Sequence, residues 1–119
     1  MTRTFEPGQF VTVFRSRLIA DADPRYESLD DELRDRARRL GGLVDVKSFA
    51  ADDGERVTIV TFEDRESHDR WASDPVHRDA QQLGRDGVYA EYSIQVGECC
   101  HASRFDRGTS VAPPAPPSA

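Results

Sequence analysis

The stretch of sequence that decides the fold is Leu43–Glu63, LVDVKSFAADDGERVTIVTFE. Both of its ends are rich in β-branched and aromatic residues, so we expect one strand over Leu43–Ala51 and another over Arg56–Glu63. The residues between them, 52–55 (DDGE), include an Asp-Gly pair, which tolerates the positive φ angles that a tight turn requires. The stretch is therefore predicted to be an antiparallel β-hairpin.

A strand and an amphipathic helix are predicted before this hairpin. Phe10–Ile19, FVTVFRSRLI, has the composition of a strand. Asp23 can then cap a helix, and Pro24 suits its first position. Apolar residues follow at spacings of three and four, which is one stripe of an amphipathic helix ending at Gly41-Gly42. The stripe consists of Tyr26, Leu29, Leu33, Ala37 and Leu40.

Two helical segments and a last strand are predicted after the hairpin. Asp64 can cap the first segment, and Asp74-Pro75 interrupts it. The second segment is expected over residues 76–85, with Gly84 and Gly87 marking its end. Residues 88–103 alternate well enough for a fourth strand, which would place Ile94 and Val96 on one face.

The predicted order is β-α-β-β-α-β, an α+β, ferredoxin-like (split βαβ) fold whose antiparallel sheet carries helices on one face. A sheet with its other face in water should alternate apolar and polar residues. The first strand does not, because Phe10 and Phe14 occupy one parity and Val11 and Val13 the other. We therefore expect the second face to be buried too, most simply against a second copy of the chain, as a homodimer.

Length and charge narrow the class of protein. The chain has 119 residues and a net charge of −6, which suits one domain and argues against a nucleic-acid partner. No apolar run approaches the roughly 20 residues that cross a membrane, and no signal segment is visible, so we expect a cytoplasmic protein without a membrane partner. We predict one domain over residues 1–105 and a flexible Pro/Ala-rich tail over residues 106–119.

Several polar groups have an unremarkable interpretation. Cys99 and Cys100 are adjacent, and neighbouring strand residues point to opposite faces, so reduced thiols are expected. With His101 they do not form a zinc spacing pattern, and no metal or cofactor is predicted. Arginines alternate with acidic residues in the first helix and suggest a solvated face, as does the charged surrounding of His68. These arginines are Arg34, Arg36, Arg38 and Arg39.

Candidate functional residues gather in the stretch 71–92. Trp71 could stack on a planar ligand or pack in the core. His77 follows Pro75 near a helix start, where its pKa would be lowered, so it could act as a neutral base or only make a local bond at the helix start. Tyr89 and Tyr92 should point to opposite faces unless a bulge intervenes, with one of them facing the pocket. Arg85 could anchor an anionic group or form a surface ion pair.

A set of residues over Phe10–Phe105 resembles the antibiotic biosynthesis monooxygenase family of the dimeric α+β barrel superfamily. The residues are Phe14-Arg15-Ser16-Arg17, Trp71, Pro75, His77, Ala80-Gln81, Gly84-Arg85, Tyr89 and Tyr92. The resemblance implies a homodimer whose two sheets close into a barrel, with a small-molecule pocket in each subunit. Some relatives oxidise aromatic polyketides to quinones without metal or flavin, and others bind and degrade haem.

The resemblance implies a small enzyme of secondary metabolism that oxidises or rearranges a planar, aromatic or polyketide-like substrate. Quinone-forming relatives have an asparagine four residues before the tryptophan, where this chain has Ser67. Haem-degrading relatives have an axial histidine ten residues after the tryptophan, where this chain has Gln81. A haem-binding protein and a non-catalytic binding protein of the same fold are the alternatives. The expected catalytic residues are His77, Trp71, Tyr89 and Tyr92. The expected substrate-binding residues are Phe14, Phe62, Ser67, Gln81 and Arg85.

Overall fold

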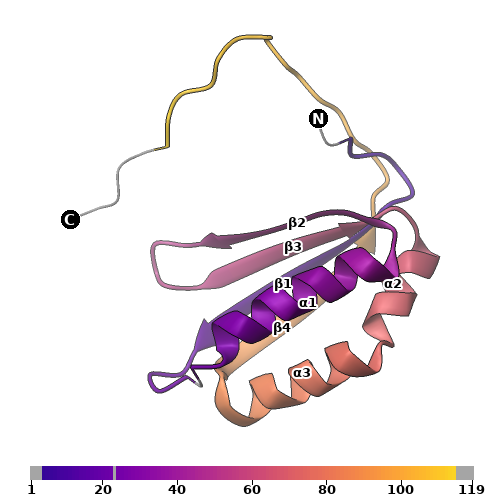
Figure 1. The fold of residues 1–119 in the computed structure, drawn as a ribbon. Coiled ribbons are helices and arrows are strands. Elements are labelled where there is room, and N and C mark those ends of the chain that lie inside the picture. Colours follow the sequence, from indigo (N-terminus) through magenta and orange to yellow (C-terminus); the bar gives the residue numbers. More distant parts are fainter. Residues whose placement is uncertain (1–3, 23, 115–119) are drawn as a thin grey trace.

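The computed structural model describes residues 4–22 and 24–114, and it confirms the predicted fold class. A four-stranded sheet carries all of its helices on one face (Figure 1). The elements are β1 (Phe10–Leu18), α1 (Tyr26–Leu40), β2 (Leu43–Ala50), β3 (Arg56–Phe62), α2 (Arg65–Ala72), α3 (Pro75–Gly87) and β4 (Tyr89–Glu98). This order is the ferredoxin-like β-α-β-β-α-β arrangement, with the second helical stretch divided in two.

The strands lie in the order β2-β3-β1-β4, and each neighbouring pair is antiparallel. The hairpin forms as predicted, and Gly54 supplies the positive φ of its turn, +91°. In the centre of the sheet Phe14 pairs with Thr58 of β3 and with Ile94 of β4. Because side chains alternate across a strand, these positions all face the helices.

Aspartates cap the starts of α2 and α3; the cap at Asp64 was predicted, whereas Asp74-Pro75 was predicted only as a helix break. The Asp64 carboxylate accepts a hydrogen bond from the backbone N–H of Ser67 at 2.8 Å, which caps α2. Asp74 accepts one from the N–H of His77 at 3.3 Å and caps α3, whose first residue is Pro75. Satisfying these donors locally lets the chain end one helix and begin the next within a few residues.

Several predicted boundaries differ from the structure. Helix α1 begins at Tyr26, so Pro24 precedes the helix instead of occupying its first position. Arg25 lies at the N-cap position and makes no side-chain capping bond. The predicted cap, Asp23, lies outside the described residues. Helix α3 continues through Gly84 to Gly87. Strand β4 ends at Glu98 because β1, its pairing partner, begins opposite it at Phe10.

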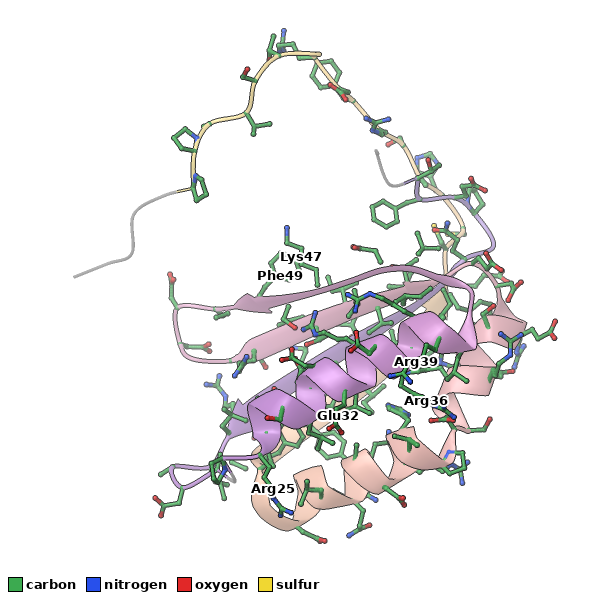
Figure 2. The ribbon with its side chains drawn as sticks, in the orientation of Figure 1. Arg25, Glu32, Arg36, Arg39, Lys47 and Phe49 are labelled. Carbon is green, nitrogen blue, oxygen red and sulfur yellow. The ribbon has the colours of Figure 1, made fainter. Side chains whose placement is uncertain are left out.

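The face of the sheet without helices carries apolar side chains. Lys47 and Phe49 project from β2 on this side, away from α1 (Figure 2), and the side chain of Phe49 is 48% exposed. By strand parity Val13 and Ile59, which pair with each other, share this face. The opposite face holds the most buried side chain, Phe62, beneath the helices.

Beyond β4 the chain contains neither helix nor strand over residues 99–114, and Figure 1 shows it leading away from the sheet. The division into a domain over residues 1–105 and a flexible tail stays a prediction; residues 1–3 and 115–119 lie outside the described part. No helix within that part is long and apolar enough to span a membrane.

Candidate functional site

A cavity of about 330 Å³ lies between the sheet and the helices. All seven elements contribute side chains to its wall. Its volume lies at the lower end of the range for small-molecule pockets, about 300–1,000 Å³. Most of the wall is apolar, and Ile94 and Val96 of β4 are left 43% and 47% exposed. This is the part of the molecule best suited to hold a small ligand.

Trp71 and His77 form one wall of the cavity. Helix α2 ends one residue after Trp71, and the short break before α3 brings His77 back over the indole. The two ring centroids lie 3.9 Å apart with an interplanar angle of 30°. Trp71 also packs against Phe62, at 5.3 Å between centroids. The tryptophan therefore lines the cavity and packs on the core at once, rather than doing only one of these.

His77 is held as a neutral imidazole. Only 8% of its surface is exposed, and burial, the largest effect, lowers its pKa. The carboxylate of Asp74 opposes this shift by favouring the charged form. The Nδ1 atom of His77 is buried without a hydrogen-bond partner within the described part of the chain. An unpaired buried nitrogen carries a cost in free energy, so this ring is held in place by packing rather than by hydrogen bonds of Nδ1.

Arg36 of α1 fixes the start of α3. Its guanidinium donates Nη2–H to Oδ1 of Asp74 at 2.7 Å and Nε–H to Oδ2 at 3.2 Å. This two-point contact holds the pKa of Asp74 below its usual value. Because Asp74 also caps α3, the ion pair ties the position of His77 to α1. Figure 2 shows Arg36 on the α1 surface near the junction of α2 and α3.

Tyr89 and Tyr92 both line the cavity, so the exception allowed for a bulge applies, and the expectation that only one of them faces the pocket was wrong. The reason is a bulge: Leu18 pairs with Tyr89 and Arg17 with Glu91, which leaves one extra residue in β4. The two phenol rings lie 5.7 Å apart. Phe14 contacts both of them, at 5.4 and 5.5 Å between centroids.

Tyr89 remains a protonated phenol. Burial is the largest cause of its raised pKa, and the neighbouring Tyr26 hydroxyl adds to it. A phenol that keeps its proton can donate a hydrogen bond to a developing oxyanion. Gly84 of α3 makes room for this ring, because a Cβ there would lie 2.6 Å from Cε2 of Tyr89.

The expected substrate-binding residues divide into two groups. Phe14 and Gln81 line the cavity. Phe62 does not, because it lies fully buried behind Trp71. Ser67 is buried against Gly42, where a Cβ would come within 2.0 Å of its Oγ, and so it faces away from the cavity. Arg85 is exposed and donates to the Tyr92 hydroxyl at 3.1 Å, which places it behind the cavity wall.

His68 is a cavity residue that the sequence interpretation missed. Its side chain is only 13% exposed, so the prediction of a solvated histidine was wrong. The ring lies near those of Phe10 and Phe62, and Nδ1 is 2.9 Å from Oδ1 of Asp69. Its spacing of three from Trp71 could have revealed it, since residues three apart share a helix face.

Arg34 was also missed, because the arginines of α1 were interpreted as one solvated face. It lines the cavity together with Asp30 and Thr58. Its Nε–H donates to Asp30 at 3.1 Å and its Nη2–H to Ser48 at 2.7 Å. Ser48 and Thr58 share a further hydrogen bond of 2.7 Å. The cavity therefore has one polar wall, formed by α1 and β3 and supported from β2 by Ser48.

The cysteines take no part in the cavity. Cys99 and Cys100 are free thiols, and Cys99 lies with His101 beside a depression on the helix-free face of the sheet. Among the described residues, no group of three or more His, Cys, Asp or Glu side chains could hold a metal ion.

The described residues form an α+β, ferredoxin-like protein with a cavity between its sheet and its helices. No protein-family model matches the chain. The jasmonate monooxygenase ABM of Pyricularia oryzae is 27% identical over 92 residues, covering 75% of this chain and 42% of that protein. The chain thus spans less than half the length of this curated relative.

Solved structures share the fold. SnoaB of Streptomyces nogalater, described as a cofactor-independent oxygenase, matches with a TM-score of 0.64 at 15% identity, over 86% of this chain and 99% of SnoaB. A structure described as an antibiotic biosynthesis monooxygenase matches with a TM-score of 0.64 at 14% identity, over 77% of this chain and 99% of the other. In fold and in its distant sequence similarity to the curated relative, the chain resembles the antibiotic biosynthesis monooxygenase family, the resemblance that its residues predicted.

Proposed function

We propose that the protein is a cofactor-independent oxygenase that uses dioxygen to oxidise a planar, aromatic or polyketide-like substrate in the cavity. The observation that carries this proposal is the stack of Trp71 and His77 in the cavity wall, a flat apolar surface beside a neutral imidazole. The names of a monooxygenase and a cofactor-independent oxygenase among the similar proteins support the same reaction class.

His77 and Tyr89 have the opposed protonation states that such a reaction needs. A neutral imidazole accepts a proton from the substrate, and a protonated phenol stabilises the negative charge that results. Gly84, which packs on Tyr89, follows His77 by seven residues, about 10 Å along α3 at 1.5 Å per residue. In a conjugated ring system the charge formed at a carbon near His77 spreads to an oxygen on the far side, nearer Tyr89.

The reaction balances with dioxygen as the oxidant. A ring CH₂ activated by a conjugated carbonyl loses a proton to His77, and the carbanion gives electrons to dioxygen. One oxygen atom forms the new C=O bond and the other leaves as water, so CH₂ and O₂ become C=O and H₂O. Trp71 and Phe14 hold the ring system in place during these steps. The substrate must itself be able to form a stabilised carbanion.

The alternatives make different demands on the cavity. A purely non-catalytic apolar cleft would need no polar side chains, whereas His77, Gln81 and Arg34 line this one. Haem binding is tested by adding hemin: a shifted Soret band, lost in His77→Ala or His68→Ala, would support it instead. In the oxygenase proposal hemin produces no specific spectral shift.

The test of the proposal uses anthrone, an activated CH₂ compound, and follows oxygen uptake and anthraquinone formation. We expect the His77→Gln variant to lower kcat about 100-fold or more, the usual effect of losing a general base. His101→Gln is the matched control and should retain activity, because His101 lies on the other face of the sheet. If His77→Gln were fully active while His68→Gln was inactive, His68 would be the base and the assignment of His77 would be wrong.

A further inference from the structure

We infer that the substrate carries a carboxylate, and that Arg34 binds it at the polar wall of the cavity. The inference rests on the proposed function, since it concerns the same cavity. Arg34 carries the only permanent positive charge among the described residues that line it. Its side chain is 23% exposed, so much of the guanidinium is shielded from water.

The guanidinium is held in a fixed orientation. Asp30 accepts from Nε–H at 3.1 Å, one helical turn earlier on α1, and Ser48 of β2 accepts from Nη2–H at 2.7 Å. Because Ser48 accepts this bond, its own hydroxyl proton is available for Thr58 of β3, 2.7 Å away. Three elements thus hold one cation, which lowers the entropy lost when a ligand binds it.

The bonds to Asp30 and Ser48 leave some N–H donors of Arg34 available for a ligand. Arg has five N–H donors, and the hydrogen bonds described above use one on Nε and one on Nη2. The remaining donors lie on Nη1 and Nη2, in the forked geometry that suits a carboxylate. Asp30 is 39% exposed, so water screens its charge and it only partly neutralises Arg34.

The apolar part of the cavity indicates the size and character of the ligand beyond its carboxylate. Thr58, beside Arg34, lies four residues along β3 from Phe62, which supports Trp71. Four residues of strand span roughly 13 Å, about the length of a fused ring system with one substituent. Ile94 and Val96 expose apolar surface to the cavity, which a flat hydrocarbon body would cover. A fused-ring carboxylate fits this arrangement of charge and apolar area.

The experiment compares anthraquinone-2-carboxylate with its uncharged carboxamide, by calorimetry on the full chain. The chain has a single tryptophan, Trp71, so quenching of its fluorescence reports binding in the cavity. We expect Arg34→Gln to weaken carboxylate binding about 10- to 100-fold, the usual effect of losing a charged hydrogen bond, and carboxamide binding less than about threefold. Asp30→Asn should tighten carboxylate binding several-fold, because it removes a competing anion.

Arg38→Gln is the matched control. Arg38 forms a similar ion pair on the same helix, with Asp35 at 3.1 Å, but does not line the cavity, so binding should not change. The inference is overturned if Arg34→Gln weakens both ligands equally or neither, or if Asp30→Asn does not tighten the carboxylate. If any of these results is found while the native protein still binds both ligands, only the carboxylate inference fails and the oxygenase proposal is unaffected. If neither ligand binds the native protein, both proposals fail.

Discussion

The pKa of the His77 imidazole is set by the residues packed around it. The sequence predicted a lowered pKa because the residue lies near a helix start, and the pKa is lowered, but burial is the largest cause. The nearby Asp74 acts in the opposite direction. Position in the sequence gave the correct direction, whereas the physical cause depends on the packing of α2 against α3.

The lowered pKa of His77 predicts a specific dependence of stability on pH. Below about pH 6.5, the ordinary pKa of histidine, the unfolded chain takes up a proton more readily than the folded protein. The free energy of unfolding should therefore be fully retained above that pH and fall as the pH drops from about 7 to 5. The contribution of one such group cannot exceed about 1.4 kcal/mol per pH unit.

Urea unfolding at pH 7.5, 6.5 and 5.5 measures this effect, with His77→Gln as the comparison. The variant lacks the titrating ring but keeps His68 and His101, so its stability should fall less steeply. Parallel curves for the two proteins would show that the pKa of His77 is not lowered by folding.

At the scale of elements, α3 and β4 meet through Gly84 and Tyr89. The glycine lies inside the helix with an ordinary φ, so its role is to leave space rather than to adopt an unusual backbone. A Cβ would lie 2.6 and 2.9 Å from ring atoms of Tyr89. The aromatic end of the cavity therefore depends on a missing side chain in the helix above it.

Gly84→Ala should displace the Tyr89 ring. Overpacking costs about 1–3 kcal/mol, against which alanine regains about 1 kcal/mol of helix propensity. We expect a lower free energy of unfolding by roughly 0–2 kcal/mol and a clear loss of anthraquinone-2-carboxamide affinity. Thermal unfolding and calorimetry provide the measurements.

Gly87→Ala is the control for this change, because Gly87 lies in the same helix with nothing within 4 Å of its would-be Cβ. It should be neutral or stabilising and leave ligand binding intact. Equal behaviour of the two variants would show that Gly84 has no special contact with Tyr89.

At the scale of the whole molecule, the helix-free face of the sheet presents apolar side chains that no other element of the described chain covers. Val13 pairs with Ile59 in the middle of the sheet, and Phe49 is half exposed at its edge (Figure 2). We propose that two copies of the chain bury these faces against each other. The dimer would then support each cavity from behind, through β1 and β3.

Val13→Glu should convert the dimer to a monomer, because it places a charge in the centre of the proposed interface. Light scattering coupled to size exclusion measures the change. Val76→Glu is the matched control, since Val76 is 45% exposed on α3, on the helix side of the molecule, and should leave the dimer unchanged. A native protein that remains monomeric at tens of micromolar would contradict the proposal.

Local sequence patterns were enough to predict the order and type of the elements, the hairpin turn, the cap at Asp64 and the helix break at Asp74-Pro75. These follow from local patterns: alternation, helical spacing, Asp-Gly and Asp-Pro pairs. The sequence also placed Trp71 and His77 in one candidate stretch, on either side of a single helix break. Each of these signals is contained within a few consecutive residues.

Which side chains share the cavity depends on contacts between elements that are distant in the sequence. A bulge in β4 turned Tyr89 and Tyr92 to one face, and nothing in the local sequence marks it. Arg34 and His68 turned inward because α1 and α2 lie over the sheet in one particular orientation, while Ser67 packed against Gly42 instead. Charge patterns indicate which helix face could meet water, but the packing of elements distant in sequence decides which charges are covered.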